Sequence, residues 1–216
     1  WFPGTMAGPA IVDTLFGDAN PGGKLPVTFP RSVGQIPIYY NQKNTGRPFK
    51  ASEKYTSKYL DIDNTPLYPF GFGLSYTKFA IENLKLDKLE ILPNEKLRVT
   101  VDVRNTGKVA GDEVVQLYMH DLAATVTRPV KELRGFKRVT LRPGEKQTVE
   151  FSLGRKELEF LGRDLKPVLE PGEFQVFVGS SSESGLQSIF SVVERYSPPR
   201  TKAAVSTIPV EPPPAA

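Results

Sequence analysis

Hydrophobic and polar residues alternate strictly along the middle of the chain. From Leu97 to Val103, apolar residues occupy every second position, and charged or polar residues occupy the positions between them. This two-residue period is that of a half-buried β-strand, which has one face in a core and the other in water. The same period returns in the segments 115–119, 149–153 and 174–178.

Turn sequences separate these predicted strands. NTGK follows the first strand at residues 105–108, RPGEK precedes the third, and EPGE precedes the fourth. Short strands at this spacing are typical of an antiparallel, immunoglobulin-like β-sandwich. The region has neither the cysteine pair nor the core tryptophan of a true immunoglobulin domain. We therefore predict a mainly β fold in which residues 77–196 form a fibronectin type III-like sandwich.

A different pattern precedes the sandwich. Ile11 and Leu15 lie on one face of a predicted short helix that can begin near Pro9 and ends at Gly17. After a turn rich in glycine and proline, residues 24–29 read as a short buried strand. A lone helix and strand cannot bury their own apolar faces. Residues 1–30 are therefore predicted to be the C-terminal end of a larger α/β domain.

Residues 31–76 are rich in Pro, Gly, Asn and Tyr and show no long periodicity, so we expect an irregular connector. We expect its aromatic residues to pack against a partner surface. These aromatic residues are Tyr39, Tyr40, Tyr55, Tyr59, Tyr68, Phe70, Phe72 and Tyr76. Residues 197–216 are proline-rich and are predicted to be an extended tail or linker.

Composition excludes several classes of protein. Without cysteine, the chain can hold neither a disulfide scaffold nor a thiolate metal site. The net charge of +4 comes from basic residues interleaved with acidic ones, as in KELRGFKRV, which favours a solvated sheet face over a nucleic-acid surface. No apolar run is long enough to span a bilayer and no signal peptide is recognisable, so we expect no membrane span.

The order of motifs resembles glycoside hydrolase family 3, in particular its periplasmic bacterial β-glucosidases. The motifs that carry the resemblance are WFPG, AIVDTLFGDANPGGKLPVTFP, SVGQIPIYYNQKNTGRP, KYTSKYLD, LYPFGFGLSYTKF, NTGKVAGDEVVQLY, TRPVKELRGFKRVTLRPGE and PGEFQVFVG. The resemblance implies a (β/α)8 barrel, an α/β sandwich and a fibronectin type III-like domain, in that order. Residues 1–30 would end the second domain, 31–76 would cross the enzyme, and 77–196 would form the third. It also implies a periplasmic or secreted location.

The resemblance implies no catalytic residue in this chain. Retaining β-glucosidases use two carboxylates roughly 5 Å apart, a nucleophile and an acid/base. In family 3 the nucleophile is on the barrel and the acid/base lies upstream of the WFPG segment, and neither motif is present. The turn after WFPG departs from the family, because Thr5, Met6, Ala7 and Gly8 stand where relatives carry a glutamate and paired glycines.

The remaining polar residues have plainer explanations. We expect Asp18 to order its turn by accepting backbone hydrogen bonds. DIDNT, with Asp61 and Asp63, resembles a calcium loop but lacks its glycine and distal glutamate. His120 is the only histidine, so a histidine metal site has no second ligand and His120 is expected to end a strand. We predict no metal and no cofactor.

The connector holds the residues we expect nearest to substrate. Arg47 stands beside a glycine turn, and KYTSKY adds Lys54, Tyr55 and Tyr59. Arginine and tyrosine can hydrogen-bond sugar hydroxyls, and tyrosine can stack on a sugar ring. The alternative is that these residues fasten the connector to the neighbouring domains.

Three hypotheses follow. The chain can be a non-catalytic C-terminal portion of a β-glucosidase, which docks against the missing barrel and α/β domains and meets a β-glucoside only through the whole enzyme. It can be a sandwich that binds a carbohydrate or a protein. It can also be a separate subunit that completes a catalytic chain. The core-facing positions of Phe151 and Phe174 count against carbohydrate binding, which normally needs exposed coplanar aromatic rings.

Overall fold

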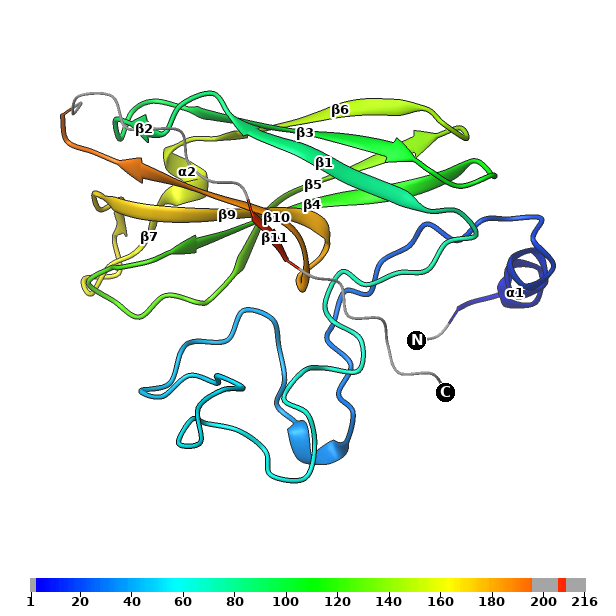
Figure 1. The fold of residues 1–216 in the computed structure, drawn as a ribbon, viewed down its shortest axis with the longest axis horizontal. Helices are drawn as coiled ribbons and strands as arrows, with labels where there is room; N and C mark the ends of the chain where they lie inside the picture. The colour runs from blue at the N-terminus through cyan, green and yellow to red at the C-terminus, as the bar shows by residue number, and fades with distance from the viewer. Residues whose placement is uncertain (1–2, 196–205, 209–216) are drawn as a thin grey trace.

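The computed structural model describes residues 3–195 and 206–208. Most of the chain is a β-sandwich that lies beside an irregular N-terminal region (Figure 1). In chain order the elements are α1 Ala7–Phe16, η1 Val33–Gln35, β1 Phe79–Leu86, β2 Glu90–Ile91, β3 Leu97–Asn105, β4 Gly111–Asp121, β5 Glu132–Leu141, β6 Lys146–Leu153, α2 Arg155–Leu158, β7 Phe160–Leu161, β8 Pro167–Val168, β9 Gly172–Ser181, β10 Ser184–Val192 and β11 Ser206–Ile208. None of the helices described is long and apolar enough to cross a membrane.

Two sheets form the sandwich. The smaller sheet has the strand order β1-β3-β6, and the larger has the order β11-β10-β9-β4-β5, with β2 paired to β10. The principal pairings are antiparallel, while β2 runs parallel to β10. The predicted antiparallel sandwich is therefore confirmed.

The core lies between the two sheets and is made of the alternating apolar positions. Burial follows the period along β3, where residues at positions 97, 99, 101 and 103 are buried. The rings of Phe174 and Phe190 stack inside the core with centroids 5.5 Å apart. Phe151 also faces this core, as predicted. Apolar burial of this kind is the main force that holds the sandwich together.

Helix α1 ends where the sequence predicts. Gly17 adopts the left-handed conformation with φ of 87°, which ends helices commonly and costs glycine no steric strain. The helix begins at Ala7, so Pro9 lies inside its first turn, where a missing N–H is tolerated. No side chain of α1 is buried.

The buried strand predicted at residues 24–29 is wrong. This segment runs beside residues 67–72 and is neither regular nor buried. Leu25 exchanges backbone hydrogen bonds with Phe72 and Gly71, and Phe29 bonds with Tyr68 and Leu67. Pro26 has no N–H to donate between these two contacts, so the pairing reduces to an isolated bridge at Phe29.

Part of the proline-rich tail lies within the described residues. Ser206–Ile208 form strand β11, antiparallel to Gly185–Gln187 of β10. The rest of the predicted tail, 197–205 and 209–216, lies outside the described residues, as does Trp1 of the WFPG motif.

Candidate functional site

The predicted substrate-proximal residues lie together on an exposed connector loop. The Arg47 carbonyl accepts a hydrogen bond from the Ser57 N–H at 2.9 Å, which closes the loop. The Lys54 ammonium lies 5.5 Å from the centre of the Tyr55 ring, a cation–π distance. The Tyr55 side chain is 74% exposed. These residues present cationic and aromatic groups to whatever lies opposite the loop.

A hollow in the connector adjoins this loop. Its volume is about 330 Å³, and its lining includes Lys43, Asn44, Phe49, Lys58 and Tyr59. Tyr59 is therefore the one predicted aromatic of the KYTSKY motif that faces this hollow, whereas Arg47, Lys54 and Tyr55 are not among its lining residues.

In DIDNT, it is Asp63 that hydrogen-bonds within its own loop. The Asp63 carboxylate accepts the Thr65 backbone N–H at 3.0 Å, and this bond is the main cause that lowers the pKa of Asp63. Asn64 accepts the Tyr59 N–H at 2.9 Å in the same way. Across the described part of the chain, no three His, Cys, Asp or Glu side chains gather to hold a metal ion. His120 is the penultimate residue of β4, and burial is the main cause that lowers its pKa.

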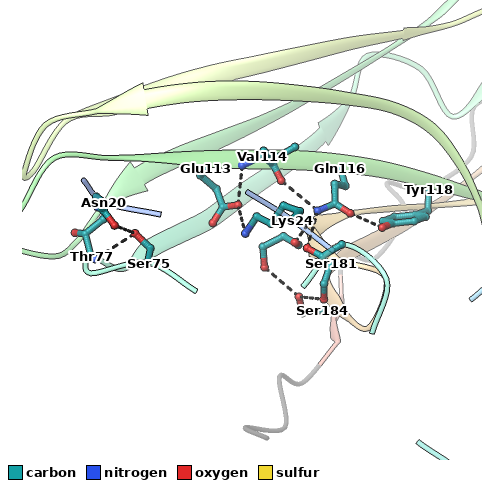
Figure 2. Close-up of polar contacts among 12 residues, drawn as sticks. Asn20, Lys24, Ser75, Thr77, Glu113, Val114, Gln116, Tyr118, Ser181 and Ser184 are labelled. Atoms are coloured by element: carbon teal, nitrogen blue, oxygen red, sulfur yellow. Dashed lines mark hydrogen bonds and ion pairs between the residues drawn. The ribbon is translucent and has the colours of Figure 1, made fainter. Parts of the chain in front are cut away.

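Asn20, rather than Asp18, orders the turn after α1. The Asn20 amide donates to the Ala110 carbonyl at 2.8 Å. Its side-chain oxygen accepts the Ser75 hydroxyl at 2.9 Å (Figure 2). The same oxygen accepts the Tyr76 N–H at 2.8 Å. The expectation for Asp18 is wrong, because its carboxylate makes no hydrogen bond to any described residue. A neutral amide both donates and accepts, so Asn20 can join the turn to two other segments at once.

An ion pair fastens the segment after this turn to the sandwich. The Lys24 ammonium lies 2.7 Å from the Glu113 carboxylate on β4, and only 15% and 8% of the two side chains is exposed. Glu113 also accepts its neighbour's N–H, from Val114, at 2.8 Å. A buried carboxylate is costly unless it is paired and hydrogen-bonded, so Lys24 and Glu113 depend on one another.

Gln116 makes the next contact along β4. Its amide donates to the Gly71 carbonyl at 3.1 Å and to the Ser180 carbonyl at 2.7 Å, and its oxygen accepts the Tyr118 hydroxyl. Gly71 has φ of 79° and lies so close that a Cβ there would stand 2.0 Å from the Gln116 oxygen. Only glycine fits this approach of the connector to the sheet.

Aromatic rings complete the interface. Tyr40 stacks on Phe70 with centroids 4.3 Å apart, and both rings meet Tyr118 edge-on at 5.6 and 6.4 Å. Burial raises the pKa of Tyr118 well above its ordinary value. A cavity of about 300 Å³ remains beside this stack, with Tyr40 and Lys131 in its lining. Burial lowers the pKa of Lys131.

We call this interface the β4 seam: Asn20, Lys24, Tyr40, Phe70, Gly71 and Ser75 on one side, and Glu113, Gln116 and Tyr118 on the other. This interface was not predicted from the sequence, although Tyr40 and Phe70 were expected to pack against another surface. A signal was present in the middle of β4, where the outward positions Val114, Gln116 and Tyr118, between Asp112 and His120, are large and uncharged, unlike the outward positions of β3. An uncharged outer face on an alternating strand indicates that another segment covers it.

Both regions of the chain match models of known protein families. Residues 1–76 match the family model of the glycosyl hydrolase family 3 C-terminal domain. Residues 113–182 match the model of the fibronectin type III-like domain. The chain matches the C-terminal part of glycoside hydrolase family 3. The first family model spans both the predicted α/β end and the connector, so it includes α1 and the connector side of the β4 seam, whereas Glu113, Gln116 and Tyr118 lie in the fibronectin type III-like match.

Relatives and solved structures agree with this match. The chain is 49% identical over 195 residues to a periplasmic beta-glucosidase of Salmonella typhimurium, covering 89% of this chain and 26% of that protein. It is 52% identical over 184 residues to a beta-xylosidase of Formosa agariphila, covering 85% and 25%. The crystal structure of a Listeria innocua beta-glucosidase in complex with glucose matches with a TM-score of 0.85 at 46% identity, covering 89% and 27%. The chain thus spans about a quarter of the length of these relatives.

Proposed function

We propose that the chain is a non-catalytic C-terminal portion of a retaining β-glucosidase, which hydrolyses terminal β-D-glucosyl residues. Its own role is to dock against the barrel and α/β domains. The observation that carries this proposal is the exposed apolar surface of residues 3–76 beside a sandwich that buries its own core. Burying one large apolar side chain stabilises an interface by about 1.5–3 kcal/mol, so this surface is suited to a docking partner.

Helix α1 is the centre of the proposed docking surface. Ile11, Val12, Leu15 and Phe16 are all exposed, on a helix with no buried residue. The Tyr76 hydroxyl donates to the Thr14 carbonyl at 2.6 Å and joins the end of the connector to the helix. The β4 seam holds the segments beside α1 on the sandwich, so the sandwich would brace the surface that the catalytic domains cover.

Arg47, Lys54 and Tyr55 form the proposed entrance to the substrate site. Their loop is exposed and carries hydrogen-bond donors and a ring of the kind that contacts sugars. In an enzyme carrying the Arg47→Ala substitution we expect KM for an aryl β-glucoside to rise several-fold while kcat changes less. Arg104→Ala is the matched control, because Arg104 is an exposed arginine of the sandwich. Equal KM values in the two variants would contradict this assignment.

A periplasmic or secreted location is part of the proposal. It is supported by the name of the Salmonella typhimurium relative. The absence of cysteine from the chain is compatible with it.

β-Xylosidase activity is the second candidate. It is supported by the 52% identity to the Formosa agariphila beta-xylosidase. Carbohydrate binding by the sandwich alone has less support, because Phe136 is the one exposed aromatic residue among the described residues 77–195. A separate subunit would need the same docking surface as a covalently joined domain.

The proposal is tested by a chimera in which this chain replaces the matching 195 residues of the Salmonella typhimurium relative. We expect the chimera to hydrolyse an aryl β-glucoside and the 216-residue chain alone to be inactive. Leu15→Asp in the chimera should lower the yield of active enzyme, because it puts a charge on the docking surface. Leu165→Asp is the control, since Leu165 is an exposed apolar residue of the sandwich.

Two results would refute the docking role. One is turnover by the chain alone, measured for both the glucoside and the xyloside. The other is a Leu15→Asp chimera as active and as stable as the Leu165→Asp control.

A further inference from the structure

If the short segments β2 and β11 are left aside, β1, β6, β5 and β10 are the strands at the borders of the two sheets, and they differ in charge. β1, β6 and β5 all carry charged residues at sheet borders. These residues are Glu82 and Lys85 on β1, Lys146 and Glu150 on β6, and Glu132, Arg134, Lys137 and Arg138 on β5. β10 has the sequence SGLQSIFSV and carries no charge at all. Charges on a border strand prevent it from pairing with another chain, so β10 lacks a protection that the other three strands have.

Two short segments lie against the outer edge of β10 instead. β2 runs parallel to it at Ser191 and Val192. β11 runs antiparallel to it at Gly185–Gln187, and the two strands lie side by side in Figure 1. β10 is thus covered by added strands, whereas the border strands β1, β5 and β6 are protected by charge.

A ladder of side chains sets the register of β11. Gln175 on β9 donates its amide to the Gln187 oxygen at 3.0 Å. This leaves the Gln187 amide directed at β11, where it donates to the Ser206 hydroxyl at 2.6 Å. Both ends of the Gln187 side chain are therefore used, and a one-residue slip of β11 would break the second bond.

Strands β9 and β10 approach each other closely near the turn of their hairpin. The pairing shifts register between Ser184 and Leu186, and Gly185 has φ of 145°. A Cβ at Gly185 would stand 2.3 Å from the Val178 carbonyl oxygen. Neither family model reaches β10 or β11, since the second ends at residue 182.

We propose that the outer edge of β10 is a strand-addition site, that its occupant is residues 206–208 of the same chain, and that this contact prevents association through β10. The inference does not depend on the proposed function. Its chemistry is that of β-augmentation, in which backbone hydrogen bonds supply the affinity and a side-chain contact supplies the register.

The first test uses the full chain with Ser206→Pro and Thr207→Pro together. Alternate residues of an antiparallel strand face the same neighbour, so this pair removes a donor whichever of the two faces β10. The matched control is Ala203→Pro with Ala204→Pro, which adds two prolines outside β11. We expect amide exchange at Leu186–Gln187 to rise about tenfold in the test variant only, because a local contact is lost while the sandwich stays folded.

Light scattering on the same variants measures association. The full chain and its control should be monomers over a range of concentrations, and the test variant should form dimers or larger species as concentration rises. Unchanged exchange together with an unchanged mass in the test variant would overturn the proposal. A full chain that is dimeric, and becomes monomeric in the test variant, would overturn the contact within one chain and indicate strand exchange between copies.

A peptide experiment separates the strand from the linker. The chain ending at residue 195 should bind a synthetic peptide AAVSTIPVE, and the peptide should restore slow exchange at Leu186–Gln187. A peptide of the same composition in scrambled order is the control. Equal effects of the two peptides would overturn the assignment of residues 206–208 as the occupant.

Discussion

Residues 77–195 bury most of their large apolar side chains, whereas residues 3–76 leave most of theirs exposed. Every buried apolar residue lies between Leu84 and Val192, whereas most of the exposed large apolar side chains lie before residue 77. The sandwich closes its own core between two sheets. The N-terminal region is instead held to the sandwich by hydrogen bonds, one ion pair and an aromatic stack, several of which involve β4. The conformation of residues 3–76 can therefore be fixed while their apolar side chains stay exposed.

The largest expected difference between the regions lies in core packing. Phe174→Ala should lower the free energy of unfolding by about 3–5 kcal/mol, because Phe174 is fully buried and stacks on Phe190. Leu15→Ala on α1 should change it by less than about 0.5 kcal/mol, because Leu15 is 71% exposed. Urea unfolding followed by circular dichroism measures both. Similar losses in the two variants would mean that α1 packs into a core of this chain.

The second prediction concerns the close approach at Gly71. Gly71→Ala should weaken the β4 seam by about 2–3 kcal/mol, because it strains a left-handed residue and displaces the Gln116 amide from two carbonyls. Proteolysis within residues 31–76 should then speed up while the sandwich resists. Gly46→Ala is the control, since a Cβ at Gly46 meets nothing within 4 Å. Equal cleavage rates in both variants would contradict the role of Gly71.

The third prediction tests the ion pair of the seam. Lys24→Met should cost about 2 kcal/mol, because it leaves the Glu113 carboxylate largely buried without its partner. Adding Glu113→Gln to it should recover part of the loss, as the neutral amide needs no cation. Hydrogen exchange at residues 20–25 is the measurement. If the double variant is no more stable than the single one, the pairing is not what stabilises the segment.

The smallest effect is a pH dependence confined to the sandwich. Hydrogen bonds from Thr148 and then Asn83 lower the pKa of Asp102 to about 2, from 3.8. A lowered folded-state pKa means stability that is present above pH 3.8 and lost as the pH falls toward 2. Asp102→Asn should remove this dependence, along with about 1 kcal/mol at neutral pH after allowance for solvent screening.

Unfolding of the wild-type chain and of Asp102→Asn between pH 2 and 6 checks this prediction. The two stability curves should converge as the pH falls through the range between the two pKa values. Curves that stay parallel would mean that Asp102 does not contribute in this way.

The sandwich was predictable because its strands are half-buried. The residues at 97, 99, 101 and 103 had to face a core whichever strands supplied the other side. The same reasoning gave a wrong prediction for residues 24–29. The apolar residues of this segment suggested burial, but Pro26 interrupts its hydrogen bonding and its neighbours in this chain are irregular. Local pattern identifies a strand only when a sheet is present to pair with it.

The β4 seam could not be read from periodicity. Lys24 and Glu113 are 89 positions apart, and no local rule connects a lysine in a glycine-rich turn to a carboxylate on a strand. Asn20 and Asp18 show that sequence patterns also fail to identify the contacting residue when two candidates are close together in the sequence. Both residues suit a turn, but only the positions of Ala110, Ser75 and Tyr76 decide that Asn20 makes the contacts.

By itself, the sequence determined the sandwich, the end of α1 at Gly17, and the order of motifs shared with glycoside hydrolase family 3. These features depend on local backbone preference and on a two-residue period, and both can be predicted from residues that are adjacent in the sequence. Tertiary structure alone decided which face of β4 the connector covers, which polar residues hold it, and how β10 is closed. Those features depend on contacts between segments far apart in the chain, where complementary charge, ring stacking and backbone pairing become visible only after folding.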